Sequence, residues 1–566
     1  TRCADVTGVQ TCALPIFAGS IRSFNRYGRG GSCASGRVPS DDFHGAPQNS
    51  NANRNDGVSG LHRRELLAAA ALMPLWPTAL ARANTATHYD VIVIGGGTAG
   101  IPCALFAAMG GARVLLVEKS PALGGTLFWS TGQIAGSGTV FQQRLGISDT
   151  PQAHFDDCMR INHGTADPAL TRLTVDHAGE TINWLADHGF EVMEGHPVTG
   201  IGHDHFTERR YQQGVNSGLS ILDAFLPSLN AMIAAGNISL LTGTAAANLI
   251  QHGDGRITGV TVAGPAGMQD ISGGHVVIAA GGCAANARLF EELHGVPLYA
   301  KTAYPTSQGD GLLLGLSAGG AIVGGEKYAC LPGLVPDAFQ YPCQMFAYAP
   351  LNPAIRMPWE ILVNAKGERF VQEDHASVHH IERGVYQQPA HRHWAIFDAA
   401  MLEKSDPIIP KWDRERLAQE HKTNAMFHSA MSIEAIALKA GLNPVALQRT
   451  VSDYNLRLTE GRADLFGRRV RPAPLSKPPY YSIAMQGWTL VSFAGLKVNP
   501  QLQVLSDEGK AIPNLYAIGE VIGAGATSGA AYTNGMLVTP AITFGRILGA
   551  NLSRNARSGE SALRGI

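Results

Sequence analysis

A glycine-rich turn between two apolar runs constrains the fold more than any other feature of the sequence. The run Val91–Ile94 is typical of a buried β-strand, and Gly95, Gly97 and Gly100 follow it directly in the spacing GxGxxG. An Ala-rich, helix-like segment comes next, and a second β-branched run ends at Glu118. Strand, glycine turn, helix, strand and acid in this order predict a βαβ unit that binds a dinucleotide.

The three glycines and the acid have separate physical roles in such a unit. Gly95 permits a tight turn, Gly97 lets the backbone approach a pyrophosphate, and Gly100 lets helix and strand pack closely. The free N–H groups at the helix N-terminus favour phosphate, and Glu118 is placed to accept hydrogen bonds from a ribose diol. The motif alone does not separate FAD from NAD.

Composition argues against several other classes of protein. The chain has 566 residues, with 45% hydrophobic and 16% charged residues and a formal net charge of −1. No basic field attracts nucleic acid, and no apolar run reaches the ~18 residues of a transmembrane anchor, so neither is expected. The cysteines form no CxxC or CxxCH motif, which argues against a bound metal or covalent haem. Cys330 and Cys343 remain either a disulfide or two free thiols.

The first part of the chain is predicted to lie outside the folded domains. Residues 1–60 are rich in Gly, Ser, Asn and Arg and lack apolar periodicity, so they are expected to be disordered. Within them, the segment 5–16 resembles the translation of a sequencing-adapter oligonucleotide, which would make the leader artefactual. Residues 61–83 resemble a twin-arginine signal peptide, and the alternative is a short amphipathic helix after a basic linker. The signal peptide predicts export of the folded protein to the periplasm.

Residues 88–553 resemble the flavoprotein subunits of the fumarate reductase and succinate dehydrogenase superfamily, which includes the 3-ketosteroid dehydrogenases. The resemblance lies in the segments VIVIGGGTAG, EKSPALGGT, VVIAAGGCAAN, ILVNAKGERFVQED and PNLYAIGEVIG. It implies an α/β fold in which a doubly wound, Rossmann-like FAD-binding domain carries an inserted α+β cap domain. The FAD contacts that it implies are Gly95, Gly97, Gly100, Glu118, Lys119, Gly125, Thr126, Ser130, Gly132, Ala280, Gly281, Asp310, Gly519, Glu520, Leu537 and Val538.

The same resemblance implies where the domains begin and end. The FAD-binding domain is expected in two parts, 84–325 and 479–553, with the cap at 326–478 between them and a C-terminal tail at 554–566. The cap region is richer in Pro and aromatic residues than the flanking βαβ segments. This change in texture is consistent with a separate module over the substrate.

The expected reaction depends on positions where the chain departs from the fumarate reductases. In that family two arginines and two histidines hold the dicarboxylate substrate or donate a proton to it. The matching positions here are Ser377, Tyr532, Leu331 and Val491, which supply no cation. Because a dicarboxylate needs cationic partners, fumarate and succinate are disfavoured as substrates.

Tyr532 is the leading catalytic candidate. Its segment, 529–545, is closer to the 3-ketosteroid dehydrogenases, although Asn534 begins a stretch that is less glycine-rich than theirs. By that resemblance Tyr532 lies beside the flavin. A neutral phenol would donate a hydrogen bond to a substrate carbonyl, whereas a phenolate, with a lowered pKa, would abstract a proton. The alternative is an aromatic side chain that only packs on the flavin loop.

Arg356 and His375 complete the predicted catalytic set. Arg356 falls where the fumarate reductases have a proton-pathway arginine, although Pro353 replaces its acidic companion. His375 follows an acidic pair directly, and imidazole is the side chain best matched to proton transfer near neutral pH. The neighbouring His379 and His380 are expected in a solvated loop.

These features predict an FAD-dependent oxidoreductase that, like the 3-ketosteroid dehydrogenases, desaturates a C–C bond next to a carbonyl by hydride transfer to flavin N5. The expected substrate is a small apolar molecule that bears a carbonyl or is unsaturated. Two alternatives stay open: an enoate reductase acting on an unsaturated acid other than fumarate, and a non-catalytic flavin-binding electron carrier. No second GxGxxG occurs in a strand–helix context, so an external electron acceptor or donor, a quinone or a cytochrome, is expected.

Overall fold

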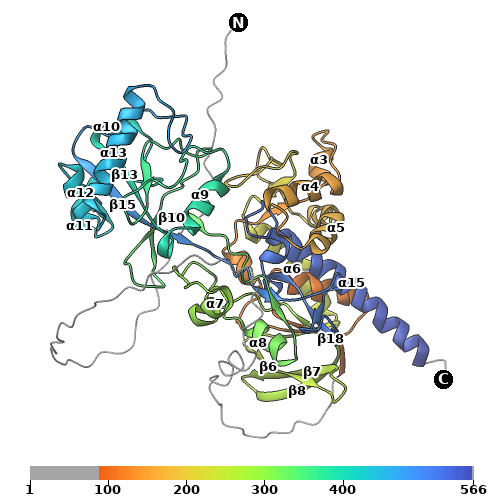
Figure 1. Cartoon of the computed structure of the whole chain (residues 1–566). Coiled ribbons are helices and arrows are strands. Elements are labelled where there is room, and N and C mark those ends of the chain that lie inside the picture. The colour runs from red at the N-terminus through yellow and green to blue at the C-terminus, as the bar shows by residue number, and fades with distance from the viewer. Residues whose placement is uncertain (1–87, 564–566) are drawn as a thin grey trace, which may run out of the picture. The chain divides into compact units, whose positions relative to one another are not determined.

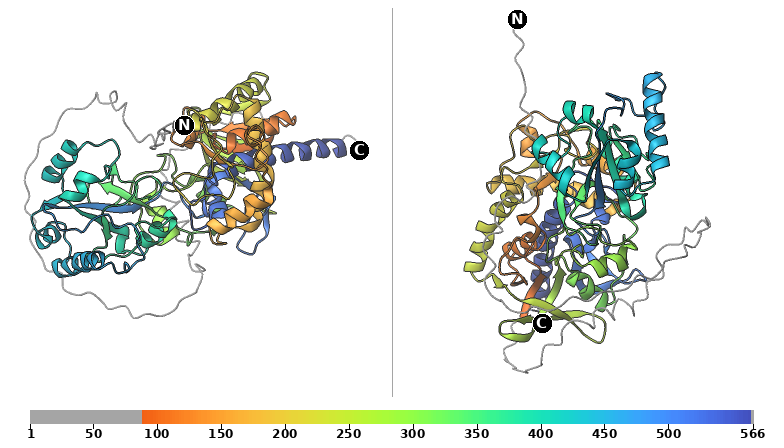
Figure 2. Two further views of the ribbon diagram at one scale, coloured as in Figure 1. Left: turned by 90° about the horizontal axis from the view of Figure 1, so that it is seen from above. Right: turned by 90° about the vertical axis from the view of Figure 1, so that its left-hand side faces the viewer.

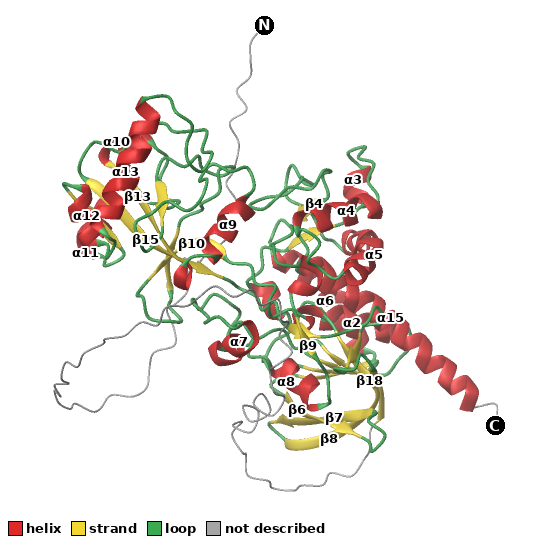
Figure 3. Ribbon diagram, viewed as in Figure 1, coloured by secondary structure: helices red, strands yellow, loops and turns green. Residues whose placement is uncertain are grey.

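A mostly parallel sheet forms around the glycine motif (Figure 3). The sheet runs in the order β17 (Gln503–Leu505), β18 (Ala511–Ala517), β8 (Gly267–Ile278), β1 (His88–Ile94), β2 (Val114–Val117) and β5 (Ile238–Leu241), with β7 (Ile257–Gly264) on β8 and β6 (Ala245–Gln251) on β7. β1 pairs in parallel with β2 on one side and with β8 on the other, and β18 adds to β8 in parallel. β17 and the β6–β7 hairpin are antiparallel additions.

The structure, a computed structural model, describes residues 88–563 and the side chains as far as Arg554. All of these residues belong to one compact unit. The expected leader, 1–60, and the expected signal peptide, 61–83, lie outside the described residues. No helix within 88–563 is both long enough and apolar enough to cross a membrane.

Close helix packing covers the β1 and β2 strands. Helix α2 (Gly100–Met109) contacts both strands, and the long helix α15 (Val538–Leu563) packs along α2. An added Cβ on Gly545 would overlap the carbonyl oxygen of Ala99, and one on Gly549 would overlap that of Cys103. Glycine is therefore required for this approach, because any side chain would separate the helices.

A second, antiparallel sheet forms the inserted domain. Helices α10 (Ala399–Lys404), α11 (Arg414–Thr423), α12 (Ile433–Lys439) and α13 (Pro444–Thr459) surround it (Figures 1 and 2). Its strands run in the order β11 (Met345–Tyr348), β10 (Leu331–Pro336), β15 (Tyr480–Trp488), β13 (Arg392–Asp398) and β12 (Ile361–Val363), with β14 (Phe427–Ala430) also on β15. β15 lies in this sheet between β10 and β13, although it follows residue 478, where the sequence placed the end of the cap.

The remaining elements lie outside these two sheets. They are η1 (Gly125–Phe128), β3 (Gln133–Ala135), α3 (Val140–Gln143), α4 (Pro151–Ile161), α5 (Pro168–Asp187), β4 (Tyr211–Gln213), α6 (Gly218–Ala234), α7 (Ala287–His294), α8 (Asp310–Ser317), β9 (Ile322–Val323), α9 (Val378–Tyr386), η2 (Pro389–His391), β16 (Gly495–Leu496), η3 (Gly519–Ile522) and α14 (Gly525–Ser528). Among them, β3 pairs with β4 and β9 pairs with β16. Cys330 and Cys343 are both buried free thiols, which resolves the alternative that the sequence left open.

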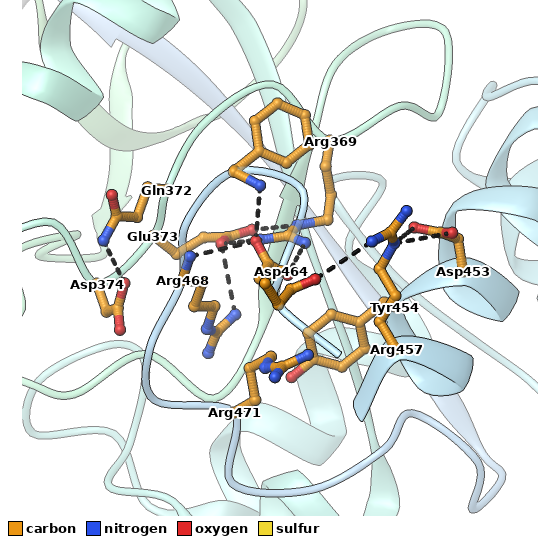
Figure 4. Close-up of polar contacts among 12 residues, drawn as sticks. Arg369, Gln372, Glu373, Asp374, Asp453, Tyr454, Arg457, Asp464, Arg468 and Arg471 are labelled. Atoms are coloured by element: carbon orange, nitrogen blue, oxygen red, sulfur yellow. Dashed lines mark hydrogen bonds and ion pairs between the residues drawn. The ribbon is translucent and has the colours of Figure 1, made fainter. Parts of the chain in front are cut away.

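A buried ionic cluster fastens the last loop of the inserted domain (Figure 4). Arg369 donates to both carboxylate oxygens of Glu373, at 2.9 and 2.5 Å, and to Asp464 at 2.6 Å. Arg468 donates to the backbone carbonyl of Glu360 at 2.7 Å. Since buried charges are stable only when paired, this loop is held by both ion pairs and hydrogen bonds.

Candidate active site

The first and third glycines of the motif are required by the protein itself. Gly95 has φ +105°, and a Cβ there would overlap the carbonyl oxygen of Ala279. A Cβ on Gly100 would overlap the carbonyl oxygen of Gly95. These two positions therefore explain the packing of turn, helix and sheet without any ligand.

Gly97 differs from them because the space in front of it is open. Apart from chain neighbours, the nearest atom to an added Cβ is Gly125 Cα, at 3.8 Å. Gly281, at the end of the neighbouring strand β8, is equally open, with Ser307 Oγ nearest at 3.9 Å. Neither glycine is demanded by packing. Both positions fit a bound molecule that lies against the backbone at the carboxyl ends of parallel strands.

Glu118 lies at the end of β2, as the motif predicts. Its two carboxylate oxygens accept hydrogen bonds from the N–H groups of Gly96 and Ser120, each at 2.7 Å. A carboxylate has about four lone-pair positions, so these two bonds fix its orientation and leave acceptors for a ligand. This geometry fits the predicted contact with a ribose diol.

Lys119 and Asp310 are brought together from distant parts of the sequence. Lys119 Nζ lies 2.5 Å from Asp310 Oδ2, and about a third of each side chain is exposed, 32% and 30%. Asp310 begins helix α8, where a negative charge is favourable. Nearby in the chain, Thr126 Oγ1 lies 3.0 Å from Thr98 Oγ1 in the glycine turn. Three of the expected FAD contacts thus have polar partners that fix them.

Glu520 brings the end of β18 to the same edge of the sheet. Gly519 has φ +77°, and its Cβ would lie 2.9 Å from the Ala99 side chain, next to the glycine turn. Glu520 Oε1 accepts hydrogen bonds from the backbone N–H of Ser492 at 2.9 Å and from its hydroxyl at 3.2 Å. Burial nevertheless raises the pKa of Glu520 to about 7. This carboxyl group can therefore donate as well as accept a hydrogen bond near neutral pH.

The other expected cofactor contacts lie in the loops around this edge. Ser130 Oγ accepts the N–H of Gly132 at 3.0 Å. Ala280 lies two residues after the end of β8, Gly125 begins η1 beside Gly97, and Leu537 and Val538 stand at the start of α15. Open glycine positions at two strand ends, a fixed carboxylate and a lysine fit the binding of a dinucleotide cofactor.

Tyr532 is buried, and its hydroxyl has one fixed partner. Its oxygen lies 2.8 Å from Thr489 Oγ1, and its ring meets the edge of Phe493 with centroids 5.7 Å apart. Burial raises the pKa of Tyr532 far above its ordinary value, and the negative charge of Glu382 adds to this effect. The phenol is therefore neutral, which favours the hydrogen-bond donor over the phenolate base.

The positions that would hold a dicarboxylate contribute no arginine around Tyr532. Within residues 88–554, the hydrogen bond and ring contacts of Tyr532 are made by Thr489, Phe493 and His203. The N–H of Val491 donates to the same Thr489 hydroxyl at 3.4 Å. Among the described residues, no arginine therefore contacts the phenol to pair with a substrate dicarboxylate.

Arg356 pairs with an acidic residue, but not at position 353, where Pro353 replaces the acid of the fumarate reductases. Its guanidinium forms an ion pair with Glu360, four residues later, and both side chains are buried. Glu360 also accepts the backbone N–H of Trp359 at 3.0 Å. These contacts lie within the inserted domain and support a structural role for Arg356.

Replacing Arg356 by methionine is expected to destabilise the fold by about 3–5 kcal/mol, because the charge of Glu360 would stay buried without a partner. A double variant with Glu360→Leu should recover most of this loss. Urea unfolding measures both effects. A double variant that regains stability but has lost turnover would contradict the structural role and return Arg356 to the reaction.

The three histidines of the cap differ in burial, and not as the sequence predicts: His379 is buried, whereas His380 is exposed. His375 Nδ1 accepts the N–H of Ser377 at 3.1 Å, and its ring stacks on the exposed His380 at 4.3 Å. His379, expected in a solvated loop, is instead buried, with Nδ1 at 3.3 Å from Glu382 Oε2. The expectation for His379 is wrong because residues 378–386 form helix α9, and positions three apart share its inner face.

Several residues near Tyr532 carry no signal in the sequence. Thr489 directly follows the central strand of the second sheet, His203 lies in a glycine-rich loop, and Glu382 lies on α9. Tyr328 is also buried close by, and its pKa is raised by burial and by Tyr532 among its neighbours. Only the folding of distant segments brings these side chains together, so no local motif reveals them.

The parallel sheet and the open glycine positions at its strand ends define a dinucleotide-binding fold. The chain belongs to the family described as FAD binding domain, whose profile matches residues 90–535. It is 28% identical over 477 residues to a fumarate reductase (cytochrome) of Shewanella frigidimarina, covering 83% of this chain and 77% of that protein. It is 27% identical over 457 residues to a vinyl phenol reductase of Lactiplantibacillus plantarum, covering 76% and 89%.

A solved structure supports the same fold. A 3-ketosteroid Δ1-dehydrogenase from Sterolibacterium denitrificans aligns with a TM-score of 0.61 at 19% identity, over 83% of this chain and 100% of that one. The expected superfamily, its α/β fold and its FAD cofactor are confirmed. The protein is an FAD-dependent oxidoreductase that acts on CH–CH bonds.

Proposed function

We propose that the protein transfers a hydride and a proton across a C–C bond next to a carbonyl group of a neutral, largely apolar substrate. The desaturation catalysed by 3-ketosteroid dehydrogenases is the reaction of this kind that we favour. The observation that carries the proposal is Tyr532, a buried phenol kept neutral by burial and hydrogen-bonded to Thr489 at 2.8 Å.

One set of residues would bind the cofactor, and Tyr532 would bind the substrate. The backbone at Gly97 and Gly281, together with Glu118 and Lys119, would hold FAD, which supplies the hydride exchange when bound. Tyr532 would donate its hydroxyl proton in a hydrogen bond to the substrate carbonyl oxygen. This bond stabilises the negative charge that develops on that oxygen when the neighbouring C–H bond is broken or formed.

The reverse reaction, reduction of an unsaturated substrate, is the second candidate. It is favoured by the two reductases among the relatives, of which one is named for vinyl phenol, a compound without a carboxyl group. An unsaturated acid other than fumarate belongs to the same candidate. Fumarate itself is disfavoured because no arginine contacts Tyr532 among the described residues.

Export and the electron partner complete the proposal. The twin-arginine pattern at 61–83 supports a periplasmic enzyme. An external quinone or cytochrome would exchange electrons with the flavin, as the relative named fumarate reductase (cytochrome) suggests.

Flavin absorbance under anaerobic conditions tests the proposal on the protein from Asn84 onward. Bleaching of the oxidised flavin by a 3-ketosteroid would support the dehydrogenase. Reoxidation of the reduced flavin by a vinyl phenol, an enone or an enoate, without bleaching by any steroid, would support the reductase. Flavin that is unchanged by every compound in both sets would contradict the proposal.

A further inference from the structure

His203 lies against the phenol of Tyr532. The two rings stack with centroids 5.4 Å apart and 26° between their planes. The loop that carries His203 is held by Asn534, whose Oδ1 accepts the N–H of Ile201 at 3.3 Å and whose Nδ2 donates to the carbonyl of Asp204 at 2.9 Å. Asn534 is the residue that departs from the glycine-richer stretch of the 3-ketosteroid dehydrogenases. That departure thus supports the position of His203.

Glu382 of helix α9 faces His203 from the inserted domain. Glu382 Oε1 lies 3.4 Å from His203 Nδ1, and Oε2 lies 3.3 Å from His379 Nδ1. His203 Nδ1 and Glu382 Oε1 have no hydrogen-bond partner among the described residues. Because an unpaired buried polar atom is costly, a proton on His203 Nδ1, facing the carboxylate, suits both atoms.

The charge of Glu382 agrees with this arrangement. Burial by itself would raise the pKa of Glu382, but its interactions with His203 and His379 bring the pKa below its ordinary value. The carboxylate is therefore ionised, and both histidines face its negative charge. From Tyr532, the contacts run through His203 and Glu382 to His379. They reach the surface there, because the exposed His163 stacks on His379 with centroids 5.4 Å apart.

We propose that His203 is a catalytic residue that exchanges a proton with the substrate beside Tyr532, and that Glu382 is a positioning residue that holds His203 charged. This inference rests on the proposed function. In the reductive direction an N–H bond of the imidazolium breaks and a C–H bond forms at the substrate carbon that does not receive the hydride. The neutral imidazole then regains a proton from water. In desaturation the same proton moves from the carbon to the neutral imidazole.

Three of the other titratable groups around His203 and Glu382 stay neutral near neutral pH, whereas Glu520, whose pKa burial raises to about 7 and whose charge acts on Tyr532, titrates in that range. Burial raises the pKa of Tyr348 to about 12 and that of Cys330 well above its ordinary value, and the charge of Glu382 acts on both. Tyr532 is also kept neutral by burial. The remaining neighbours lie at the exposed end, where they act on His163 or His379, and they are Arg383, Asp204 and His380.

Turnover of the holoenzyme as a function of pH tests both roles. His203→Gln is expected to lower turnover by about 10²–10⁴-fold with FAD still bound. Glu382→Gln is expected to move the pH midpoint of turnover down by about 1–3 pH units, because a positive charge loses its counter-charge. This sign holds in both directions of the reaction. His380→Gln, on the same helix but exposed, is the matched control and should change neither quantity.

Two results would overturn the inference. Unchanged turnover in His203→Gln would remove that residue from proton exchange. A slower Glu382→Gln enzyme with the wild-type pH midpoint would make Glu382 a merely structural residue.

A second readout is independent of any substrate. In the holoenzyme labelled with ¹³C at histidine Cε1, the NMR signal that disappears in His203→Gln should titrate at lower pH in Glu382→Gln than in the wild type. If no compound reacts with the flavin, the proposed function fails, while this titration still decides whether Glu382 controls the charge of His203. An unshifted titration would overturn the inference in either case.

Discussion

Replacing Tyr532 by phenylalanine is expected to lower turnover by about 10²–10³-fold while FAD stays bound, the magnitude typical of losing one donor to a developing oxyanion. The change removes only the hydroxyl that lies 2.8 Å from Thr489 Oγ1. The aromatic contacts with Phe493 and His203 remain possible, so folding and flavin binding should be preserved. Steady-state turnover and the flavin absorbance of the purified variant measure the two parts of this expectation.

Tyr454→Phe provides the matched control for this variant. Tyr454 is another buried tyrosine, on helix α13, and its hydroxyl donates to the carbonyl of Ala473 at 3.5 Å. The Tyr454→Phe enzyme also lacks one hydroxyl. Because this hydroxyl lies within the inserted domain and bonds to Ala473, the turnover of the variant should stay at the wild-type level. A Tyr532→Phe enzyme that turns over as fast as Tyr454→Phe would show that the hydroxyl of Tyr532 has no catalytic role and that the side chain only packs.

A methyl group on Gly97 is expected to weaken FAD binding by at least about 100-fold, which corresponds to ~2.7 kcal/mol. Among the described residues, no atom outside its chain neighbours lies closer than 3.8 Å to the added Cβ, so the apoprotein has room for Gly97→Ala. Its unfolding free energy should change by less than ~1 kcal/mol. The lost affinity would arise because the methyl group keeps the backbone away from the pyrophosphate. Flavin content after purification and urea unfolding of the apoprotein measure both quantities.

Alanine variants at two other glycines serve as controls for this prediction. Gly253 lies in a turn and has no atom within 4 Å of an added Cβ, so Gly253→Ala should keep both FAD and stability. Gly100→Ala should fail to fold normally, because its Cβ would overlap the carbonyl oxygen of Gly95. Full flavin content in Gly97→Ala would mean that the cofactor does not pass in front of Gly97.

The nucleotide-binding part of the fold could be predicted from the sequence because its chemistry is local. The turn that needs Gly95 and Gly100 lies within a few residues, and the strand that ends at Glu118 follows after one helix. Strand β18 completes the sheet as the segment PNLYAIGE predicts, and it pairs in parallel with β8. Apolar runs and glycine turns of this kind are visible without any knowledge of tertiary contacts.

The end of the insertion and the surroundings of Tyr532 could not be predicted in the same way. β15 is rich in aromatic residues, as many strands are, and only its pairing with β13 and β10 assigns it to the second sheet. His203 and Glu382 meet through tertiary folding, with no shared motif. The acidic partner of Arg356 is Glu360, which follows it in the chain, whereas the comparison with the fumarate reductases placed that partner before it, at Pro353. Each of these pairings depends on tertiary geometry, which one sequence does not record.

The packing of α15 on α2 has a consequence for the order in which the enzyme matures. A ribosome makes the glycine turn early, but Gly519 and the helix that needs Gly545 arrive hundreds of residues later. The edge of the sheet that would hold FAD is closed by Glu520, at the end of β18, and the turn is supported from behind by α15. Cofactor capture should therefore follow the completion of synthesis through the C-terminal segment, rather than accompany the emergence of the N-terminal βαβ unit.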